Sequence, residues 1–570
     1  MSWRRRSASL AIYGLLVAAV LVLSACGPTA RPTGPGEPRS GSSSPPQASA
    51  PRGTLTVAWA QEPSNLRPKF GEQGFVGADL GNIFDSALAY YDNRGTLHPL
   101  MAQQLPTPEN GGWVINPDGT MVTIFRLREN IRWHDGVPLT AHDFAFAHRV
   151  DTDPGVPFSR TIEGLISEVE ARDNNTIVIR WSESYIRANE GLRPLPRHLL
   201  EEKYRTARGD EFVSGEEWTT GFVGSGPYRL ERWDRGSRIV ARAYQDWFRG
   251  PPRIETIEIR FITDPNTVLA HMLSGEVDLA WTPLVRFDIA TAQELWAARG
   301  EGYLKSWETR LRYLEFQYRE VPNWQRAGAD PRIRQALIHA IDRPAIAEVM
   351  TGGLGRAADA WVLPVDPIFP DVDRAITKYP YDPRRASSLL AEAGWQAQLG
   401  SGVTDPDGKT LDIEMNGGST GPQIATIIAD NWKAVGVNSS VATTPAANAR
   451  DPVFRATFPG THIGETNATP FGFRFISAMI PNPPLTLGWN VGSFSDPEVD
   501  RLHNLAVTSF DERVRRDAYV GLNQRMSAQA AYSPIYYPAE IVLARSRLTG
   551  PVGEYGWGLS WNIFEWEVAD

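Results

Sequence analysis

The stretch FRLRENIRWHDGVPLTAHD, residues 125–143, holds the end of a strand, a turn and the start of a helix in succession. The strand is predicted over Met121–Leu127, where β-branched and aromatic residues are frequent. Asp135 and Gly136 form a turn signal, because Asp bonds its own backbone and Gly tolerates left-handed conformations. Thr140 and Asp143 resemble a capping box in front of a helix over Phe144–Val150. A strand and a helix this close together predict an α/β fold.

The same alternation continues on both sides of this stretch. Strands are predicted over Leu55–Trp59, Thr176–Trp181 and Ile254–Phe261. A helix is predicted over Gly77–Tyr91, because its apolar residues recur on one helical face. The mixture extends over the whole length and contains no repeat of fixed period, which favours α/β lobes over an all-α or all-β body.

Asp-Pro pairs mark several helix starts. The Asp carboxylate can accept from free N–H groups, and Pro at the first helical position lacks a donor that would be unpaired there. Glycines at 275, 394 and 436 follow helical stretches and predict their C-terminal ends. The four pairs are Asp264-Pro265, Asp330-Pro331, Asp382-Pro383 and Asp496-Pro497.

Length, charge and cysteine content exclude several classes of protein. The chain has 570 residues, which at roughly 150 residues per domain predicts about three or four domains. The 57 Lys and Arg against 66 Asp and Glu give a net charge of −9, which argues against a nucleic-acid partner. The single Cys excludes an internal disulfide and a multi-thiolate zinc site. The 19 Trp and 17 Tyr could line a core or a ligand site.

Residues 1–25 are expected to be a lipoprotein signal peptide. Arg4, Arg5 and Arg6 form a positive segment, and the uncharged run from Leu10 to Ala25 is short for a bilayer span. It ends in Leu-Ser-Ala-Cys, which looks like a lipobox with Cys26 as the lipid attachment site; the alternative is a buried Cys in a plain signal anchor. Two or more acyl chains would hold the protein on a membrane stably.

Residues 26–52 are rich in Pro, Gly and Ser and predict a tether. Removal of residues 1–25 would delete three Arg and no acid, leaving a charge of 54 − 66 = −12. No later apolar run is long enough to span a bilayer, so the body is expected to be soluble and extracytoplasmic, lipid-anchored at the outer face of the bacterial cell membrane, in the periplasm or at the cell surface.

No catalytic, cofactor or metal motif stands out. The chain has no His-Glu-x-x-His, Gly-x-Ser-x-Gly or phosphate-binding loop, so we expect neither an enzyme nor a cofactor. His142 and His148 lie six apart, on different faces of a helix, which disfavours a metal site. Asp405–Gly408 faintly resembles a calcium loop but lacks the later ligands, so a hairpin turn before a strand over Leu411–Met415 is favoured.

Several segments, in order, resemble the extracytoplasmic solute-binding proteins of ABC importers, in the branch that includes oligopeptide-, dipeptide- and nickel-binding members. Residues 125–143 are the most specific of them. Arg67 stands where the family usually has Asp. Most motif residues are expected to serve the fold, and Arg334, Asp342 and Arg343 could form helix-surface pairs. The other segments are Glu62–Pro68, Phe84–Leu88, Leu97–Ala102, Gly224–Tyr228, Leu273–Asp278, Ile333–Arg343, Ala386–Trp395, Phe494–Asp500 and Pro534–Tyr537.

The resemblance implies a type II periplasmic-binding-protein fold with two lobes, a hinge and an extra small lobe. Lobe I is expected at 53–88, 208–307 and 508–570, the extra lobe II at 89–207 and lobe III at 308–507. It also implies that a solute binds in the cleft and favours closure of the lobes, which the ABC permease subunits then recognise. No covalent chemistry is required.

Candidate ligand contacts follow from the same resemblance. Peptide-binding members usually carry an Asp-Tyr pair in lobe III that meets the peptide amino terminus; here that pair is missing, and Glu465 either replaces its carboxylate or is a loop residue. Glu72 is either a ligand contact or a surface residue. The remaining candidates could equally be core or loop residues; they are Trp281, Tyr313, Phe316, Trp489 and Asn490.

The resemblance predicts a lipid-anchored importer component, monomeric, that captures a peptide or another polar organic solute such as an oligosaccharide. Nickel is disfavoured because no His-rich cleft is visible. Two alternatives from other classes remain: a sensory receptor with the same clamp, and a hydrolase acting on cell-wall peptide.

Overall fold

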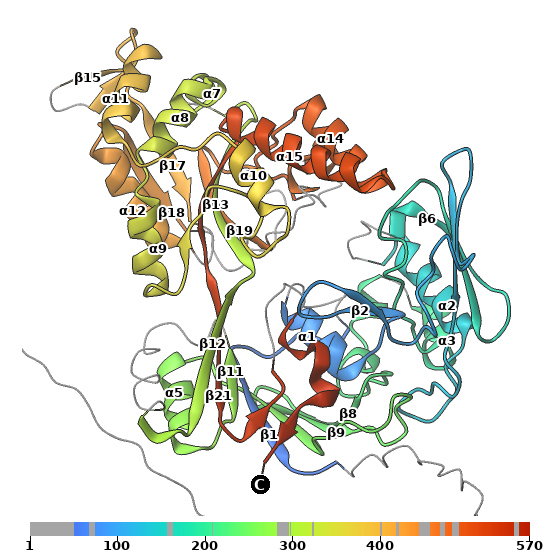
Figure 1. The fold of residues 1–570 in the computed structure, drawn as a ribbon. Coiled ribbons are helices and arrows are strands. Elements are labelled where there is room, and N and C mark those ends of the chain that lie inside the picture. The colour runs from blue at the N-terminus through green and yellow to red at the C-terminus, as the bar shows by residue number, and fades with distance from the viewer. Residues whose placement is uncertain are drawn as a thin grey trace, which may run out of the picture. The chain divides into compact units, whose positions relative to one another are not determined.

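A computed structural model describes residues 51–67, 75–156, 163–207, 209–281, 296, 298–321, 324–398, 402–417, 421–443, 456–467, 473–481, 489–551 and 558–569. Residues 48–570 form one compact unit, in which most strands belong to three sheets of seven, six and four strands (Figure 1). Helices accompany each of these sheets, which confirms the predicted α/β class.

The seven-stranded sheet has the order β12-β21-β11-β1-β10-β9-β8. Strand β1 is parallel to β10 and β11, and β21 is antiparallel to β11 and β12. Helix α1 packs against the 3-10 helix η6 and contributes to one apolar core with this sheet. The elements are β1 (Thr54–Trp59), α1 (Phe75–Phe84), β8 (Tyr228–Asp234), β9 (Arg238–Ala243), β10 (Thr256–Phe261), α5 (Pro265–Ser274), β11 (Leu279–Trp281), β12 (Gly302–Glu308), β21 (Ala539–Arg545) and η6 (Leu559–Glu565).

The six-stranded sheet has the order β14-β20-β13-β19-β17-β18. Its strands are β13 (Arg310–Phe316), β14 (Arg356–Ala357), β17 (Asp412–Asn416), β18 (Asn438–Ala442), β19 (Thr461–Asn467) and β20 (Tyr532–Tyr537). The accompanying helices are α7 (Gln325–Ala329), α8 (Pro331–His339), α9 (Arg343–Thr351), α10 (Phe369–Ala375), α11 (Pro383–Glu392), α12 (Pro422–Lys433), η4 (Phe473–Phe475), η5 (Ser477–Met479), α14 (Pro497–Thr508) and α15 (Glu512–Ala528).

The four-stranded sheet, β4-β5-β7-β6, is antiparallel throughout. Its strands are β4 (Trp113–Ile115), β5 (Met121–Arg126), β6 (Ile166–Ala171) and β7 (Thr176–Trp181). The helices between and after these strands in the chain are α2 (Ala141–Thr152), η1 (Glu163–Leu165), α3 (Arg197–Thr206), α4 (Asp210–Val213) and η2 (Glu216–Trp218). Three two-stranded pairs complete the described fold: β2 (Ala89–Tyr91) with β3 (Leu97–Pro99), β15 (Gln396–Gln398) with β16 (Gly402–Thr404), and β22 (Leu548–Thr549) with β23 (Glu567–Val568).

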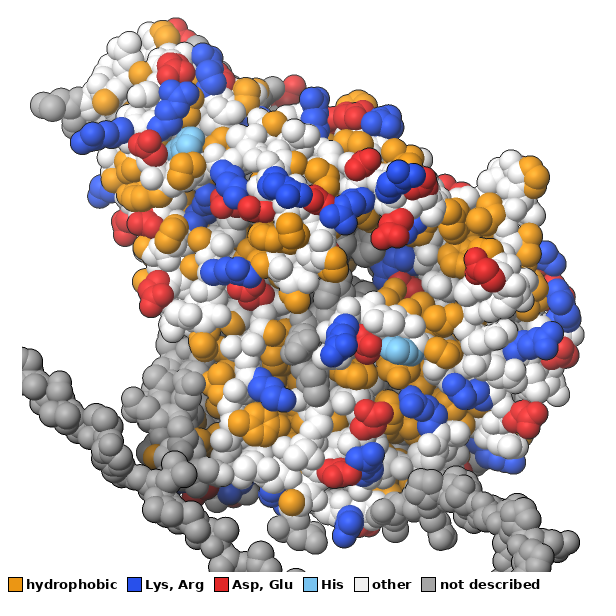
Figure 2. Space-filling view, viewed as in Figure 1, with side chains coloured by type: hydrophobic (Ala, Val, Ile, Leu, Met, Phe, Trp, Pro, Cys, Tyr) orange, Lys and Arg blue, Asp and Glu red, His pale blue; other side chains and the backbone are white. Residues whose placement is uncertain are grey.

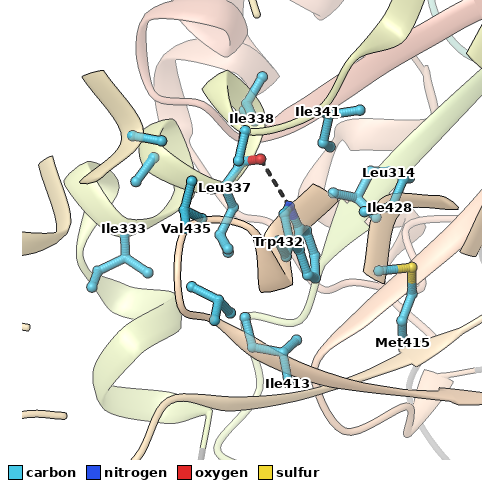
Figure 3. Packing of buried hydrophobic residues seen from close by; sticks show 14 of the residues in the cluster. Leu314, Ile333, Leu337, Ile338, Ile341, Ile413, Met415, Ile428, Trp432 and Val435 are labelled. Atoms are coloured by element: carbon cyan, nitrogen blue, oxygen red, sulfur yellow. Dashed lines mark hydrogen bonds between the residues drawn. The ribbon is translucent and has the colours of Figure 1, made fainter. Parts of the chain in front are cut away.

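The largest apolar core lies between the six-stranded sheet and its helices. Trp432 of α12 is completely buried there, and its indole N–H donates to the Leu337 carbonyl of α8 at 2.9 Å (Figure 3). A buried indole needs such an acceptor, because an unpaired polar group in an apolar core is destabilising. This bond fixes α12 against α8.

Motif residues join the seven-stranded sheet to the four-stranded one. Arg67 and Asp85 form an ion pair at 3.0 Å with both side chains 2% exposed, and Arg67 also donates to the Pro194 carbonyl. The Ser225 hydroxyl donates to Asp85 at 2.7 Å. Arg67, which departs from the family pattern, therefore completes a buried network that holds the fold together.

His134, from the stretch 125–143, fixes the same junction. The N–H of Gly224 donates to His134 Nδ1 at 3.2 Å, so Nε2 carries the proton and donates to the Gly226 carbonyl at 3.0 Å. A Cβ at Gly226 would lie 2.5 Å from the backbone of Phe84 and Asp85, so only glycine permits this approach. The Gly-Ser-Gly segment is therefore structural, as expected.

The local signals for helix starts are confirmed. Each Asp of the four Asp-Pro pairs accepts a hydrogen bond from the backbone N–H two or three residues further on. The Thr140 N–H donates to Asp143 at 2.8 Å, as in a capping box. Asp405 accepts from the N–H groups of residues 407 and 409 in the predicted turn.

Two local predictions are wrong. The helix expected over Gly77–Tyr91 ends at Phe84, because Asp85 is held by Arg67 and Ser225 and residues 89–91 pair with β3. Arg334 and Arg343 do not lie on the helix surface but are 5% and 6% exposed, and Arg343 forms an ion pair with Asp359, which lies beyond the helix. Both donate to backbone carbonyls, Arg334 to Ala530 and Arg343 to Tyr379. Buried guanidinium groups need such acceptors.

Candidate functional site

Two stretches of chain connect the seven-stranded sheet to the six-stranded one. Strand β12 continues into β13 with only Thr309 between them, and β20 continues into β21 with only Pro538 between them. β12 pairs with β21 over its whole length, and β13 pairs with β20. Figure 1 shows these strands running from one sheet to the other. Extended connections of this kind let two lobes rotate by small changes at a few residues.

A group of four charged side chains lies at this crossing. Arg310 donates to Glu465 at 2.8 Å and also forms an ion pair with Glu540, and Arg312 forms an ion pair with Glu465. Arg312 and Glu540 are nearly buried, with side chains 4% and 8% exposed. Among the described residues, the group pairs two cations with two anions.

Two tryptophans and Glu540 share one face of the seven-stranded sheet beside this group. Trp307 lies opposite Glu540 in the β12–β21 pair, and Trp281 lies opposite Val542 in the β11–β21 pair. Residues two apart on a strand point to the same face, so Glu540 and Val542 bring the two indoles to one side. Trp281 also meets Trp59 edge to face, with centroids 5.9 Å apart.

Helix α1 adds a buried carboxylate to this face. Asp79 is 0% exposed, and its Oδ1 accepts from the Ser560 N–H at 2.9 Å and from the Ser560 hydroxyl at 2.5 Å. Its Oδ2 has no hydrogen-bond partner among the described residues. Burial raises the pKa of Asp79 to about 6, with the Ser560 bonds acting against the rise and the charge of Glu540 adding to it.

These residues enclose a narrow recess of about 310 Å³, a volume that includes open solvent. Gly558 closes one side with φ 90°, and a Cβ there would lie 2.8 Å from Asp79 Oδ1. The recess is lined by Asp79, Trp281, Trp307, Glu540, Val542, Gly558 and Leu559.

Of the residues proposed from sequence, Trp281 lines this recess and Glu465 belongs to the charged group beside it. Tyr313 is 2% exposed and packs against Trp361, with Arg474 donating to its hydroxyl at 3.3 Å. Phe316 is completely buried and stacks on Trp324 in the core of the six-stranded sheet. We therefore leave Phe316 out of the proposed site.

Trp489 and Asn490 lie apart from the recess. The guanidinium of Arg474 stands over the Trp489 ring at 4.8 Å. Asn490 is completely buried, donates to the carbonyls of Ile476 and Phe494, and accepts from Phe494 and Tyr532. These bonds hold a loop in place, so we also leave Asn490 out of the proposed site. Glu72 and Cys26 lie outside the described residues.

Sequence reasoning missed Asp79, Trp307 and Glu540. A signal did exist for Asp79, because it is the one charged residue in the segment FVGADLGNIF, whose only other polar side chain is Asn82. A lone carboxylate inside a buried helix needs a partner, and that requirement points to a site. No comparable local signal marks Trp307 or Glu540.

Neither a metal site nor a membrane span is found in the part of the chain that the structure describes. There, no three His, Cys, Asp or Glu residues are grouped as metal ligands would be. No helix among the described residues has the length and apolar character needed to cross a bilayer. On the face shown in Figure 2, basic and acidic side chains are interspersed and do not form a patch of one sign.

Residues 97–477 match the family model of the bacterial extracellular solute-binding proteins, family 5 Middle. The match covers more than half of the chain, so the chain belongs to this family. Its members are solute-binding components of transport systems and not enzymes. The oligopeptide-binding protein AppA of Bacillus subtilis is 24% identical over 593 aligned residues, which cover 96% of both chains.

Solved structures agree with this assignment at the level of the fold. The oligopeptide-binding protein of Thermus thermophilus, complexed with a pentapeptide, has a TM-score of 0.75 at 21% identity, covering 90% of this chain and 96% of that one. NikZ from Campylobacter jejuni, in complex with Ni(L-His), has a TM-score of 0.73 at 22% identity, covering 90% and 99%. These likenesses confirm the fold class expected from the sequence.

Proposed function

We propose that the protein is the solute-binding component of an ABC importer, which captures a peptide or another polar organic solute between its lobes and delivers it to the permease. The observation that carries this proposal is the similarity over 96% of both chains to an oligopeptide-binding protein. The described fold, which matches a peptide complex over 90% of this chain, supports it.

The crossing strands support a clamp mechanism. Only the two connections at Thr309 and Pro538 join the seven- and six-stranded sheets as continuous chain among the described residues. A solute that contacts both sheets binds more tightly to the closed arrangement and shifts the population toward it. The permease then distinguishes loaded from empty protein by this closure.

The lobe assignment is part of the proposal, with one adjustment. Residues 508–537, assigned from sequence to lobe I, include α15, which packs on α14 and α10, and β20, which belongs to the six-stranded sheet. We therefore place the boundary between lobes III and I near Pro538. Residues 53–88 and 208–307 remain in lobe I, and 89–207 form the extra lobe.

Attachment to the membrane through Cys26 is likewise a proposal. It rests on the sequence Leu-Ser-Ala-Cys after an apolar run and on the Pro-, Gly- and Ser-rich residues 26–52 that follow. Mass spectrometry of the membrane-extracted protein should find diacylglycerol on Cys26. A Cys26→Ser variant should be released from the membrane fraction, and retention of that variant would contradict the anchor.

Thermal unfolding with a panel of solutes tests the binding function. The panel contains dipeptides, oligopeptides, oligosaccharides and a nickel–histidine complex. A ligand present at 100 times its Kd stabilises the folded state by about 2.7 kcal/mol, so a true ligand raises Tm in a saturable manner. A panel in which no solute raises Tm would count against the proposal, whereas a response to one class identifies the solute.

A further inference from the structure

We propose that the recess formed by Asp79, Glu540, Trp281 and Trp307 binds the cationic group of the solute, an ammonium or a guanidinium. This inference rests on the proposed solute-binding function and names the chemistry that one part of the site selects. The family match and the similar structures give no role to these residues.

The first argument is charge balance. Around the crossing, Arg310 and Arg312 form ion pairs with Glu465 and Glu540, whereas no cation of the described residues forms an ion pair with Asp79. Among the described residues, Asp79 Oδ1 accepts from the N–H and from the hydroxyl of Ser560, and both of these donors are neutral. A buried carboxylate without a cation is costly, and a cation that enters the recess removes this cost.

The second argument is the direction in which Asp79 can still bond. Oδ2 has no partner in the described structure, and Asp79 lines the recess. An ammonium or guanidinium N–H can donate to this oxygen, and such charge-assisted bonds are about twice as strong as neutral ones. A neutral hydroxyl could also donate, but it would not compensate the charge.

The third argument is the nature of the walls. Trp281 and Trp307 are only partly buried, so their indole rings present π-electron surface to whatever occupies the recess. Trp is the best aromatic partner for a cation, and such contacts are strongest where water is excluded. An anionic group would meet Asp79, Glu540 and the negative ring faces, and is therefore disfavoured.

Calorimetric titration of the full chain at pH 8, where Asp79 is ionised, tests the proposal with four matched probes. These are Ala-Ala-Ala, N-acetyl-Ala-Ala-Ala, N-acetyl-Ala-Lys-Ala and N-acetyl-Ala-norleucine-Ala. Ala-Ala-Ala is paired with its N-acetyl form, and the Lys peptide is paired with the norleucine peptide. In one or both of these pairs, we expect the probe that carries the additional cation to bind at least tenfold more tightly. Equal affinity within both pairs would overturn the proposal.

Single-residue variants test which side chains cause the preference for cationic probes. Asp79→Asn retains an oxygen that can accept from Ser560 but removes the charge, so it should abolish the tenfold preference. Trp307→Leu should reduce the preference about threefold, and Asp246→Asn, on an exposed turn, should leave it unchanged. A preference that survives Asp79→Asn would show that the cation binds elsewhere and would refute the assignment.

A solute of another class separates this proposal from the general function. If an oligosaccharide or an anionic chelate binds and no cationic probe does, solute binding stands and the cation recess is wrong. If no solute of any class binds, both proposals fail. Unfolding midpoints of all variants, measured without ligand, establish that each is folded.

Discussion

Asp85 and Asp79 are both buried carboxylates within or just after helix α1, yet their surroundings are opposite. Asp85 is paired with the Arg67 guanidinium and accepts from Ser225, so its charge is fully compensated. Asp79 accepts from the N–H and the hydroxyl of Ser560 and lines the narrow recess. The comparison teaches that one carboxylate completes the fold, whereas the other retains bonding capacity for a solute.

Removal of the Asp85 charge should have the largest effect. Asp85→Asn leaves the Arg67 guanidinium buried without its counter-ion and also removes the carboxylate that offsets the charge of nearby Arg193. Breaking a buried ion pair on one side is destabilising by about 3–5 kcal/mol. Urea unfolding should show this loss relative to the wild type and to Asp246→Asn. A loss below about 1 kcal/mol, the range of an exposed pair, would mean that the network does not hold the two sheets together.

His134, which bonds Gly224 and Gly226 at the same junction, should make the protein sensitive to acid. Burial lowers the pKa of His134 to about 4, and protonation of Nδ1 would break its bond from the Gly224 N–H. The contribution of His134 to the free energy of unfolding is present above the pKa of His in the unfolded chain, about 6.5. It is lost as the pH falls toward 4, by up to about 3 kcal/mol. In His134→Gln this loss between pH 7 and pH 4 should be smaller. If the free energy of unfolding of His134→Gln fell between pH 7 and pH 4 by as much as that of the wild type, this role of His134 would be contradicted.

Asp79 should show the reverse dependence on pH. The pKa of Asp79 is raised in the folded protein, so its contribution to the free energy of unfolding is present below about pH 4. This contribution is lost as the pH rises through about 6, by about 2–3 kcal/mol. Asp79→Asn should therefore gain stability relative to the wild type as the pH rises from 4 to 8. If Asp79 were only a cap for η6, the variant would show no such gain.

A helix cap gives the smallest expected effect. Asp382 accepts from the Arg385 N–H at 2.9 Å at the start of α11. Asp382→Ala should lower the free energy of unfolding by about 1 kcal/mol, the usual loss for an N-cap. Asp246→Ala, on an exposed turn, is the control and should change it by less than about 0.5 kcal/mol. Equal effects of the two variants would contradict the capping role.

The difference between these residues also explains what the sequence could predict. The cap at Asp382 acts over three residues, so the Asp-Pro pair was sufficient to predict it. The pairing of Asp85 with Ser225 spans 140 residues, and its effect in ending α1 at Phe84 could not be read locally. The Asp79–Ser560 bond spans 481 residues.

The candidate site was predictable only in part, for the same reason. Trp281 was proposed because it ends a strand, and it lines the recess. Phe316, near the crossing, and Asn490, before a loop, are also proposed from the sequence, and the structure buries both completely, with the Asn490 amide donating to Ile476 and Phe494. Trp307 and Glu540 meet only through the register of β12 with β21, which no local pattern encodes.

The central claim is that this family 5 chain binds a solute in the cleft beside its crossing strands, and one measurement tests it most directly. Thermal unfolding of the full chain should be followed across the solute panel at pH 8, with the concentration of each active solute varied. We predict a saturable rise in Tm for a peptide or another polar organic solute. No rise with any solute, at concentrations up to solubility, would contradict the claim.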